Sequence, residues 1–133
     1  IFVVQDLDLL KMPDTTLFLR ELKNRGMDMK KIKIIINRYV KTSLTPKHII
    51  QALSYYSDPA MSFVDELLPS KVDYAILPYN LNNYAKYIES VAQGVIAYKG
   101  YSADFVQAVN DIVKMFNANK GSGNSKSSRR LFG

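Results

Sequence analysis

Two polar residues, Asn37 and Arg38, follow three consecutive isoleucines in the segment KIKIIINRYV, at positions 31–40. An apolar, β-branched run of this kind predicts a strand that is buried on both faces of a sheet. In open sheets of parallel strands, ligands bind beyond the carboxyl ends of the strands, which is where Asn37 and Arg38 would lie. The pattern therefore makes Asn37 a candidate ligand-binding residue. The alternative is that its side chain only hydrogen-bonds the turn after the strand.

Asp6 and Asp8 are a second candidate pair, because they follow an apolar segment, residues 1–5, and carboxylates there could hold a metal ion. The alternative, which we favour, is that they are solvated loop acids near the start of a helix. The chain has no cysteine and a single histidine, His48, which excludes disulfides, thiolate metal sites and histidine clusters. His48 has no recognisable partners for a catalytic triad, and we expect it to be exposed. A chain without cysteine fits a reducing compartment.

The elements that must position these residues are three short strands, predicted at residues 1–5, 33–37 and 74–77, with Pro78 ending the third. Helices are predicted at about 13–25 before Gly26, after Thr45 and Pro46, at about 81–98 before Gly100, and at about 102–116. A short helical turn is expected at 63–67. Strands and helices that alternate in this way form parallel sheets. We therefore predict an α/β fold, part of a doubly wound, mainly parallel sheet with helices on both faces.

The charge of the chain is concentrated at its C-terminal end. Residues 117–133 contain four basic residues and no acid, whereas residues 1–116 contain fourteen basic and twelve acidic residues, a net charge of only +2. We therefore expect no nucleic-acid binding by the body of the chain. The stretch NANKGSGNSKSS has no large apolar residue and predicts a flexible linker, so we divide the chain into a domain portion, 1–116, and a flexible basic tail, 117–133. Because the chain opens directly on a strand without an initiator Met, we expect a fragment of a larger domain.

Three segments carry a resemblance to a known family: IIINRY, VDYAILPYNLNNYAKYIESVAQGV and SADFVQAVNDIVKMF. In their order and spacing, over residues 1–116, they resemble the C-terminal half of the ParA/MinD family of P-loop ATPases, closest to its CpaE/TadZ pilus-assembly branch. Two features depart from the family. Ile96 stands where members usually have proline after the Gln-Gly turn, and the connection SDPAMSFVDELLPSK is longer than usual.

The resemblance implies an adenine site. In the family, the asparagine of the Asn-Arg pair hydrogen-bonds the adenine edge, and the loop after the next strand's proline packs on the base. This nominates Asn37 and Arg38, framed by Pro78, Tyr79 and Asn80. A carboxamide suits the task because it both donates to and accepts from adenine. For Arg38, a surface salt bridge or a stacking cation is an equal alternative.

The phosphate half of such a site is missing from this sequence. The family holds phosphates on a glycine-rich Walker A loop with Lys and Ser or Thr, and none of the six glycines lies in such a run. The resemblance implies ATP or ADP with Mg²⁺ as the cofactor of the intact protein. Because most nucleotide affinity in such sites comes from phosphate contacts, this chain alone should bind nucleotide weakly at most and should not hydrolyse ATP.

The tail ends in Arg129, Arg130, Leu131 and Phe132, similar to the basic and apolar membrane-targeting tail of MinD-type ATPases. The resemblance therefore implies a cytoplasmic, homodimeric ATPase, with the tail as its candidate contact to an anionic membrane surface at the inner face of the cell membrane. Its implied role is to localise or assemble a pilus or secretion apparatus, with the assembly proteins as partners. The alternative, from another class, is a non-catalytic α/β protein-interaction module in which Asn37 and Arg38 are structural.

Overall fold

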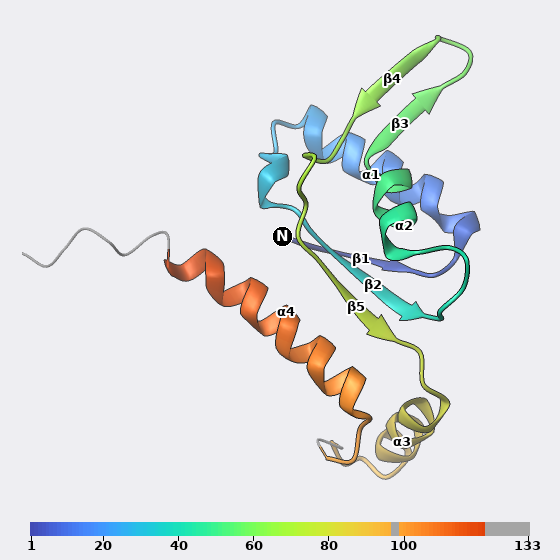
Figure 1. Ribbon diagram of the computed structural model, residues 1–133, viewed down its shortest axis with the longest axis vertical. Coiled ribbons are helices and arrows are strands. Elements are labelled where there is room, and N and C mark those ends of the chain that lie inside the picture. Colours follow the sequence, from blue (N-terminus) through green and yellow to red (C-terminus); the bar gives the residue numbers. More distant parts are fainter. Residues whose placement is uncertain (97–98, 122–133) are drawn as a thin grey trace, which may run out of the picture.

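A parallel sheet of three strands organises the protein, whose computed structural model describes residues 1–96 and 99–121 (Figure 1). Its strands are β1 (Phe2–Asp6), β2 (Lys33–Tyr39) and β5 (Tyr74–Pro78), and their order is β1-β2-β5 with β2 in the centre. Both pairings are parallel. The predicted strands and the α/β class with its parallel sheet are therefore confirmed.

Helices cover both faces of this sheet. The covering helices are α1 (Met12–Asn24), α2 (Pro46–Leu53) and α4 (Ala103–Gly121), whereas α3 (Leu81–Ala92) lies beyond the carboxyl end of β5. Two short 3₁₀ turns are η1 (Leu9–Lys11) and η2 (Met29–Lys31). Figure 1 shows α1 and α2 on one side of the strands and α4 on the other. Each strand-to-strand connection passes over the α1 and α2 side, as expected for parallel strands that need a crossover. None of the helices within the described ranges is long and apolar enough to cross a membrane.

The main core lies between the sheet and helices α1 and α2. Alternate strand residues point to this side, and Val3, Ile34 and Ile36 are buried there. They pack with buried leucines and isoleucines of the two helices, namely Leu19, Ile49 and Leu53. Full burial of such a side chain contributes about 1.5–3 kcal/mol, so this cluster supplies most of the cohesion of the fold.

The opposite face of the sheet is covered only in part. Val4, Ile35 and Ala75 lie in one register row across the three strands and point towards the α4 side. Ile35 and Ala75 are buried, whereas Val4 on the edge strand is 57% exposed. Helix α4 packs along β5 and reaches β1 only near its far end, where the Phe116 and Phe2 ring centroids lie 6.4 Å apart, so that Val4 stays exposed.

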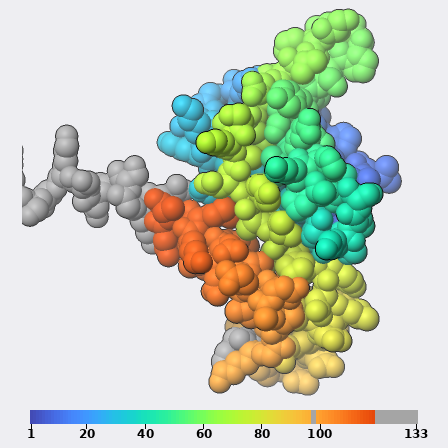
Figure 2. Space-filling view, viewed as in Figure 1, coloured from blue at the N-terminus to red at the C-terminus, as the bar shows by residue number. Residues whose placement is uncertain are grey.

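An antiparallel hairpin, β3 (Tyr55–Asp58) and β4 (Phe63–Glu66), stands where a helical turn at 63–67 was predicted, so that prediction is wrong. The hairpin projects at one end of the molecule (Figure 2). Its aromatic and β-branched residues favour extended chain. Contacts distant in sequence hold it, because the Arg20 guanidinium of α1 lies 4.4 Å from the Tyr56 ring centroid and Lys23 pairs with Asp65.

Two predicted helix ends are also wrong. Helix α3 ends at Ala92, not at 98, because Gly94 adopts a left-handed φ of +65° that closes the helix there. Helix α4 continues past 116 to Gly121, so the first residues of the predicted tail are helical. The remainder of the tail, residues 122–133, lies outside the described residues. Gly26, with a φ of +83°, closes α1 as predicted.

Candidate functional site

The carboxyl end of β2 has an irregular backbone that aims two successive side chains at one partner. Along a regular strand, Asn37 and Arg38 would point to opposite faces of the sheet. Arg38 instead has a left-handed φ of +53°, and the pairing with β5 shifts register between Ile36 and Tyr39. A bulge of this kind re-aims side chains, and a left-handed residue other than glycine costs about 1–2 kcal/mol. The end of β2 therefore holds backbone strain.

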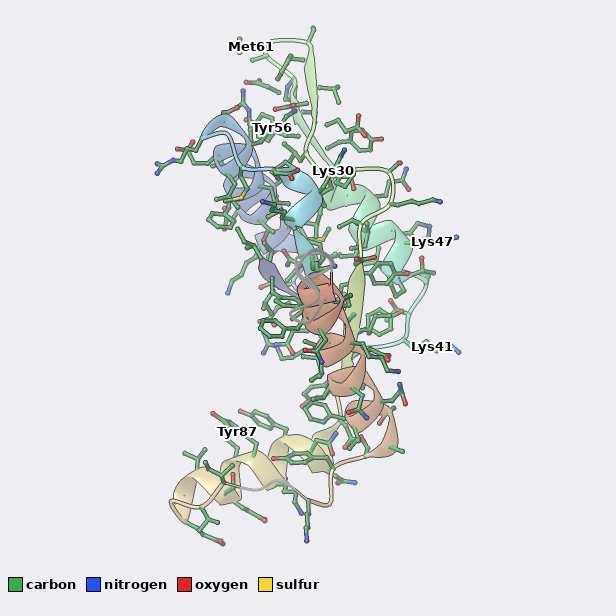
Figure 3. The ribbon with its side chains drawn as sticks, turned by 90° about the vertical axis from the view of Figure 1, so that its left-hand side faces the viewer. Lys30, Lys41, Lys47, Tyr56, Met61 and Tyr87 are labelled. Atoms are coloured by element: carbon green, nitrogen blue, oxygen red, sulfur yellow. The ribbon has the colours of Figure 1, made fainter. Side chains whose placement is uncertain are left out.

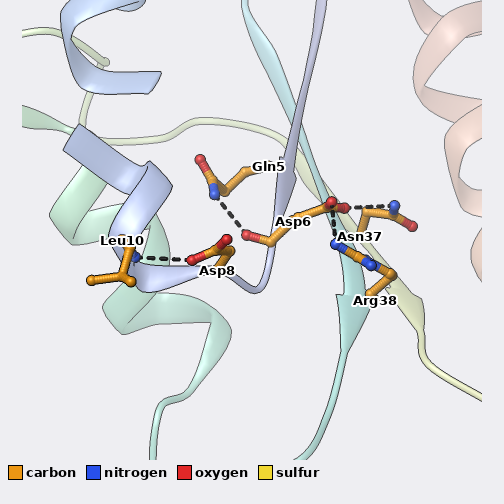
Figure 4. Close-up of polar contacts among 6 residues, drawn as sticks. All are labelled: Gln5, Asp6, Asp8, Leu10, Asn37 and Arg38. Carbon is orange, nitrogen blue, oxygen red and sulfur yellow. Dashed lines mark hydrogen bonds and ion pairs between the residues drawn. The ribbon is translucent and has the colours of Figure 1, made fainter. Parts of the chain in front are cut away.

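Both side chains bind the carboxylate of Asp6, the last residue of β1 (Figure 4). Asp6 is the register partner of Asn37, and one carboxylate oxygen accepts a hydrogen bond of 2.7 Å from Asn37 Nδ2. The other oxygen accepts one of 2.7 Å from Arg38 Nη2. The surface salt bridge weighed for Arg38 is therefore present, and Asp6 is not the solvated loop acid that we favoured.

The second acid, Asp8, has a different partner from Asp6. Its carboxylate caps η1 by accepting a hydrogen bond of 3.1 Å from the Leu10 backbone N–H. Within the described residues, no group of three or more metal-ligating side chains comes together. His48 is exposed, as predicted, and its ring takes part in a capping box with Thr45 at the start of α2.

The predicted loop after β5 is fixed to the end of β2. Pro78 is the last residue of β5, and the Tyr79 N–H donates a 2.9 Å hydrogen bond to the Tyr39 carbonyl. Asn80 caps α3, because its side-chain oxygen accepts from the backbone N–H groups of Asn82 and Asn83. The amide oxygen of Asn80 is therefore occupied by the helix start.

These strand ends border a pocket of about 620 Å³ between the sheet, α3 and α4. The five residues nominated from the sequence all line it: Asn37, Arg38, Pro78, Tyr79 and Asn80. The rest of its lining comes from α3 and from the start of α4: Asn83, Tyr84, Tyr87, Tyr101 and Phe105. The volume falls in the range of about 300–1,000 Å³ that small-molecule sites occupy. The structure thus brings all five nominated residues together.

The aromatic wall of this pocket was missed from the sequence. Tyr84 and Tyr87 lie on α3 and are 52% and 54% exposed. Figure 3 shows Tyr87 projecting from α3. The missed signal was their spacing of three residues on a helix that follows the nominated loop, which places both rings on one face. Tyr101 and Phe105 form a neighbouring pair, with ring centroids 5.3 Å apart.

A short polar chain joins α3 to the start of α4 beside the pocket. Asn83, only 8% exposed, donates from Nδ2 to the Ser102 hydroxyl at 2.8 Å and accepts from the Ser102 N–H at 3.0 Å. Hydrogen bonding from the Ser102 hydroxyl, followed by the Phe105 N–H, lowers the pKa of Asp104 from its ordinary value. The ionised Asp104 carboxylate therefore stabilises the fold above the ordinary aspartate pKa. This stabilisation is lost as the pH falls through the lowered pKa of Asp104.

Chemically, the pocket is suited to binding a planar ring. Aromatic side chains supply faces for stacking, and the Asn37 carboxamide supplies a donor and an acceptor.

The nominated membrane-binding residues lie outside the described part of the chain: Arg129, Arg130, Leu131 and Phe132. Comparison with protein-family models, curated proteins and solved structures finds no match to this chain. What the fold and the pocket define is an α/β protein with an aromatic pocket at the carboxyl edge of its parallel sheet.

Proposed function

We propose that this pocket binds the adenine side of ATP or ADP, and that the chain is the C-terminal part of a ParA/MinD-like ATPase that localises or assembles a pilus or secretion apparatus. One observation carries the proposal. Five residues nominated from two separate segments of sequence line a single pocket of suitable volume. The pocket lies at the carboxyl ends of parallel strands, which is where open α/β sheets bind ligands.

The lining supplies both parts of base recognition. Tyr84 and Tyr87 offer half-exposed rings on which a purine would stack, an interaction that contributes about 1–3 kcal/mol per base. Asn37 would pair with the polar edge of the base, and a good two-point contact of this kind discriminates against a wrong base by about 1–3 kcal/mol. Pro78 and Tyr79 would frame the ring from the loop after β5.

The phosphates and Mg²⁺ would be held by residues outside this sequence, which has no glycine-rich Lys-Ser/Thr loop. We therefore expect this chain alone to bind adenine nucleotides weakly and not to hydrolyse ATP. In the intact protein, nucleotide binding would control dimerisation, and with it the contacts to assembly proteins and to the membrane surface.

A second candidate function is a non-catalytic protein-interaction module. The bonds of Asp6 to Asn37 and Arg38 favour it, since they give the Asn-Arg pair a structural role without any ligand. Under this alternative, the pocket of the parent chain binds no nucleotide, and replacing Asn37 only lowers the stability of the fold.

Titration of the isotope-labelled chain with AMP, followed by NMR to millimolar concentration, separates the two functions. Asn37→Ala should weaken AMP binding about 5- to 150-fold, which is the range for losing a two-point base contact. Asn82→Ala is the matched control, because Asn82 is exposed on the same helix as the pocket tyrosines but does not line the pocket. Loss of thermal stability in Asn37→Ala, with no AMP binding by the parent chain, favours the interaction module.

A further inference from the structure

The carboxylate of Asp6 fixes which way the Asn37 carboxamide faces. Asparagine amides are close to symmetric in shape, so either the oxygen or the nitrogen can face a given partner. An ionised carboxylate accepts hydrogen bonds and cannot donate them. At 2.7 Å from Asp6, Asn37 must therefore present its nitrogen to the carboxylate. Figure 4 shows the Asn37 oxygen on the side away from Asp6.

Asp6 is itself held in place by Arg38. The Arg38 guanidinium donates to the second carboxylate oxygen at 2.7 Å, so each oxygen of Asp6 has one partner. This arrangement depends on the bulge at Arg38, which brings two successive side chains of β2 to the same side. The strained backbone thus has a consequence for the pocket, because it immobilises the residue that orients Asn37.

From this geometry we infer that Asp6 is the positioning residue that makes the pocket specific for adenine over guanine, an inference that rests on the proposed nucleotide function. With its nitrogen turned to Asp6, Asn37 offers the pocket its carbonyl oxygen and its second N–H. The N6 amine and N7 of adenine are a donor beside an acceptor, which matches this pair. Guanine presents two acceptors there, O6 and N7, so its O6 would meet the amide oxygen.

Rotation of the amide would relieve that clash only by creating another. A flipped Asn37 would turn its oxygen to the Asp6 carboxylate, placing two acceptors at hydrogen-bond distance without a proton between them. An unmet polar contact of this kind is costly when water is excluded, and the purine would cover the site. Selectivity thus arises from a residue that, in this account, does not touch the base.

The test measures the affinities of the full chain for AMP and for GMP by NMR titration. The two nucleotides carry the same phosphate and differ only in the base. We expect AMP to bind about tenfold more tightly than GMP. In Asp6→Asn, whose carboxamide can either donate or accept, the ratio of the two affinities should fall towards one. Because both nucleotides feel the lost charge equally, a general change in phosphate attraction cancels in this ratio. Asp8→Asn removes a nearby charge without touching Asn37 and should keep the tenfold ratio.

The possible outcomes separate the role of Asp6 from the nucleotide function of the pocket. A parent chain that prefers AMP, together with an Asp6→Asn variant that keeps this preference at unchanged melting temperature, overturns the role of Asp6 and leaves the adenine pocket standing. Equal binding of AMP and GMP by the parent chain also overturns it, with the pocket still a nucleotide site. Binding of neither nucleotide at millimolar concentration overturns the proposed function and this inference together.

Discussion

Asn83 and Ser102 exchange two hydrogen bonds, of 2.8 and 3.0 Å, that join α3 to the start of α4. Asn83 is buried and both bonds are partly buried, which limits the competition from water. The two helices carry the aromatic wall of the pocket, and this reciprocal pair links the segments that contribute it.

The first prediction is that Asn83→Ala destabilises the chain. Removal of the amide leaves the Ser102 N–H without its partner in a partly buried place, which costs about 1–3 kcal/mol. Chemical denaturation should give this loss in the free energy of unfolding. Asn82→Ala, at an exposed neighbouring position, is the control and should change stability by less than about 0.5 kcal/mol. Equal stability of the two variants would show that the α3–α4 link contributes little.

The second prediction concerns the strained backbone at Arg38. Alanine there would lose the ion pair with Asp6 and keep a left-handed φ of +53°, whereas glycine would lose the same ion pair and relieve the strain. The free energy of unfolding of Arg38→Gly should therefore be roughly 1 kcal/mol higher than that of Arg38→Ala. This difference should remain even though glycine makes the unfolded chain more flexible, which by itself lowers stability. If the alanine variant is the more stable one, β2 has no strained bulge in solution.

The structure also explains which features the sequence could and could not predict. The strand before Asn37 follows from a local signal, the isoleucine run, whereas the loop at Pro78, Tyr79 and Asn80 was nominated from the resemblance to ParA/MinD ATPases. The bulge at Arg38 has no such signal, because arginine has no preference for a left-handed φ.

The missed hairpin has a similar cause. Strands β3 and β4 are only four residues each, and α1 holds them through Arg20 and Lys23. The hairpin residues do favour extended chain, but strands this short also need such contacts distant in sequence, which the local pattern does not show. The end of α3 was misplaced for the opposite reason, because two glycines, Gly94 and Gly100, both suit a helix end and only the first is used.

The third prediction is that the chain associates with itself. The edge strand β1 exposes Val4, and α4 exposes three valines spaced three or four apart, which share one helix face: Val106, Val109 and Val113. Sedimentation velocity should detect dimers or larger species as the concentration rises. Val109→Lys combined with Val113→Lys should shift the chain towards monomer, whereas Met61→Lys, at the exposed tip of the hairpin, should not. A parent chain that stays monomeric at high concentration would contradict this prediction and the expected homodimer.

The fourth prediction concerns the tail residues Arg129, Arg130, Leu131 and Phe132. Each basic residue near an anionic membrane contributes about 1 kcal/mol, and burial of the leucine and the phenylalanine adds about 1.5–3 kcal/mol each. Ordering the tail offsets much of this, so a single tail should bind marginally and a dimer with two tails should bind usefully. In co-sedimentation with anionic vesicles, the chain should bind at low salt and be released at high salt. A version that ends at Ser128 should not bind; equal binding by both versions would remove the membrane role.

The most direct test of the central claim is to map AMP on the chain by NMR, following backbone amides and aromatic ring signals together. We predict weak, saturable shifts that gather on Asn37, the loop at Tyr79 and Asn80, and the rings of Tyr84 and Tyr87, all of which line one pocket. The Tyr55 ring, half-exposed on the distant hairpin, serves as an internal control and should not shift. Shifts elsewhere on the surface, or none at millimolar AMP, would contradict an adenine site at the ends of β2 and β5.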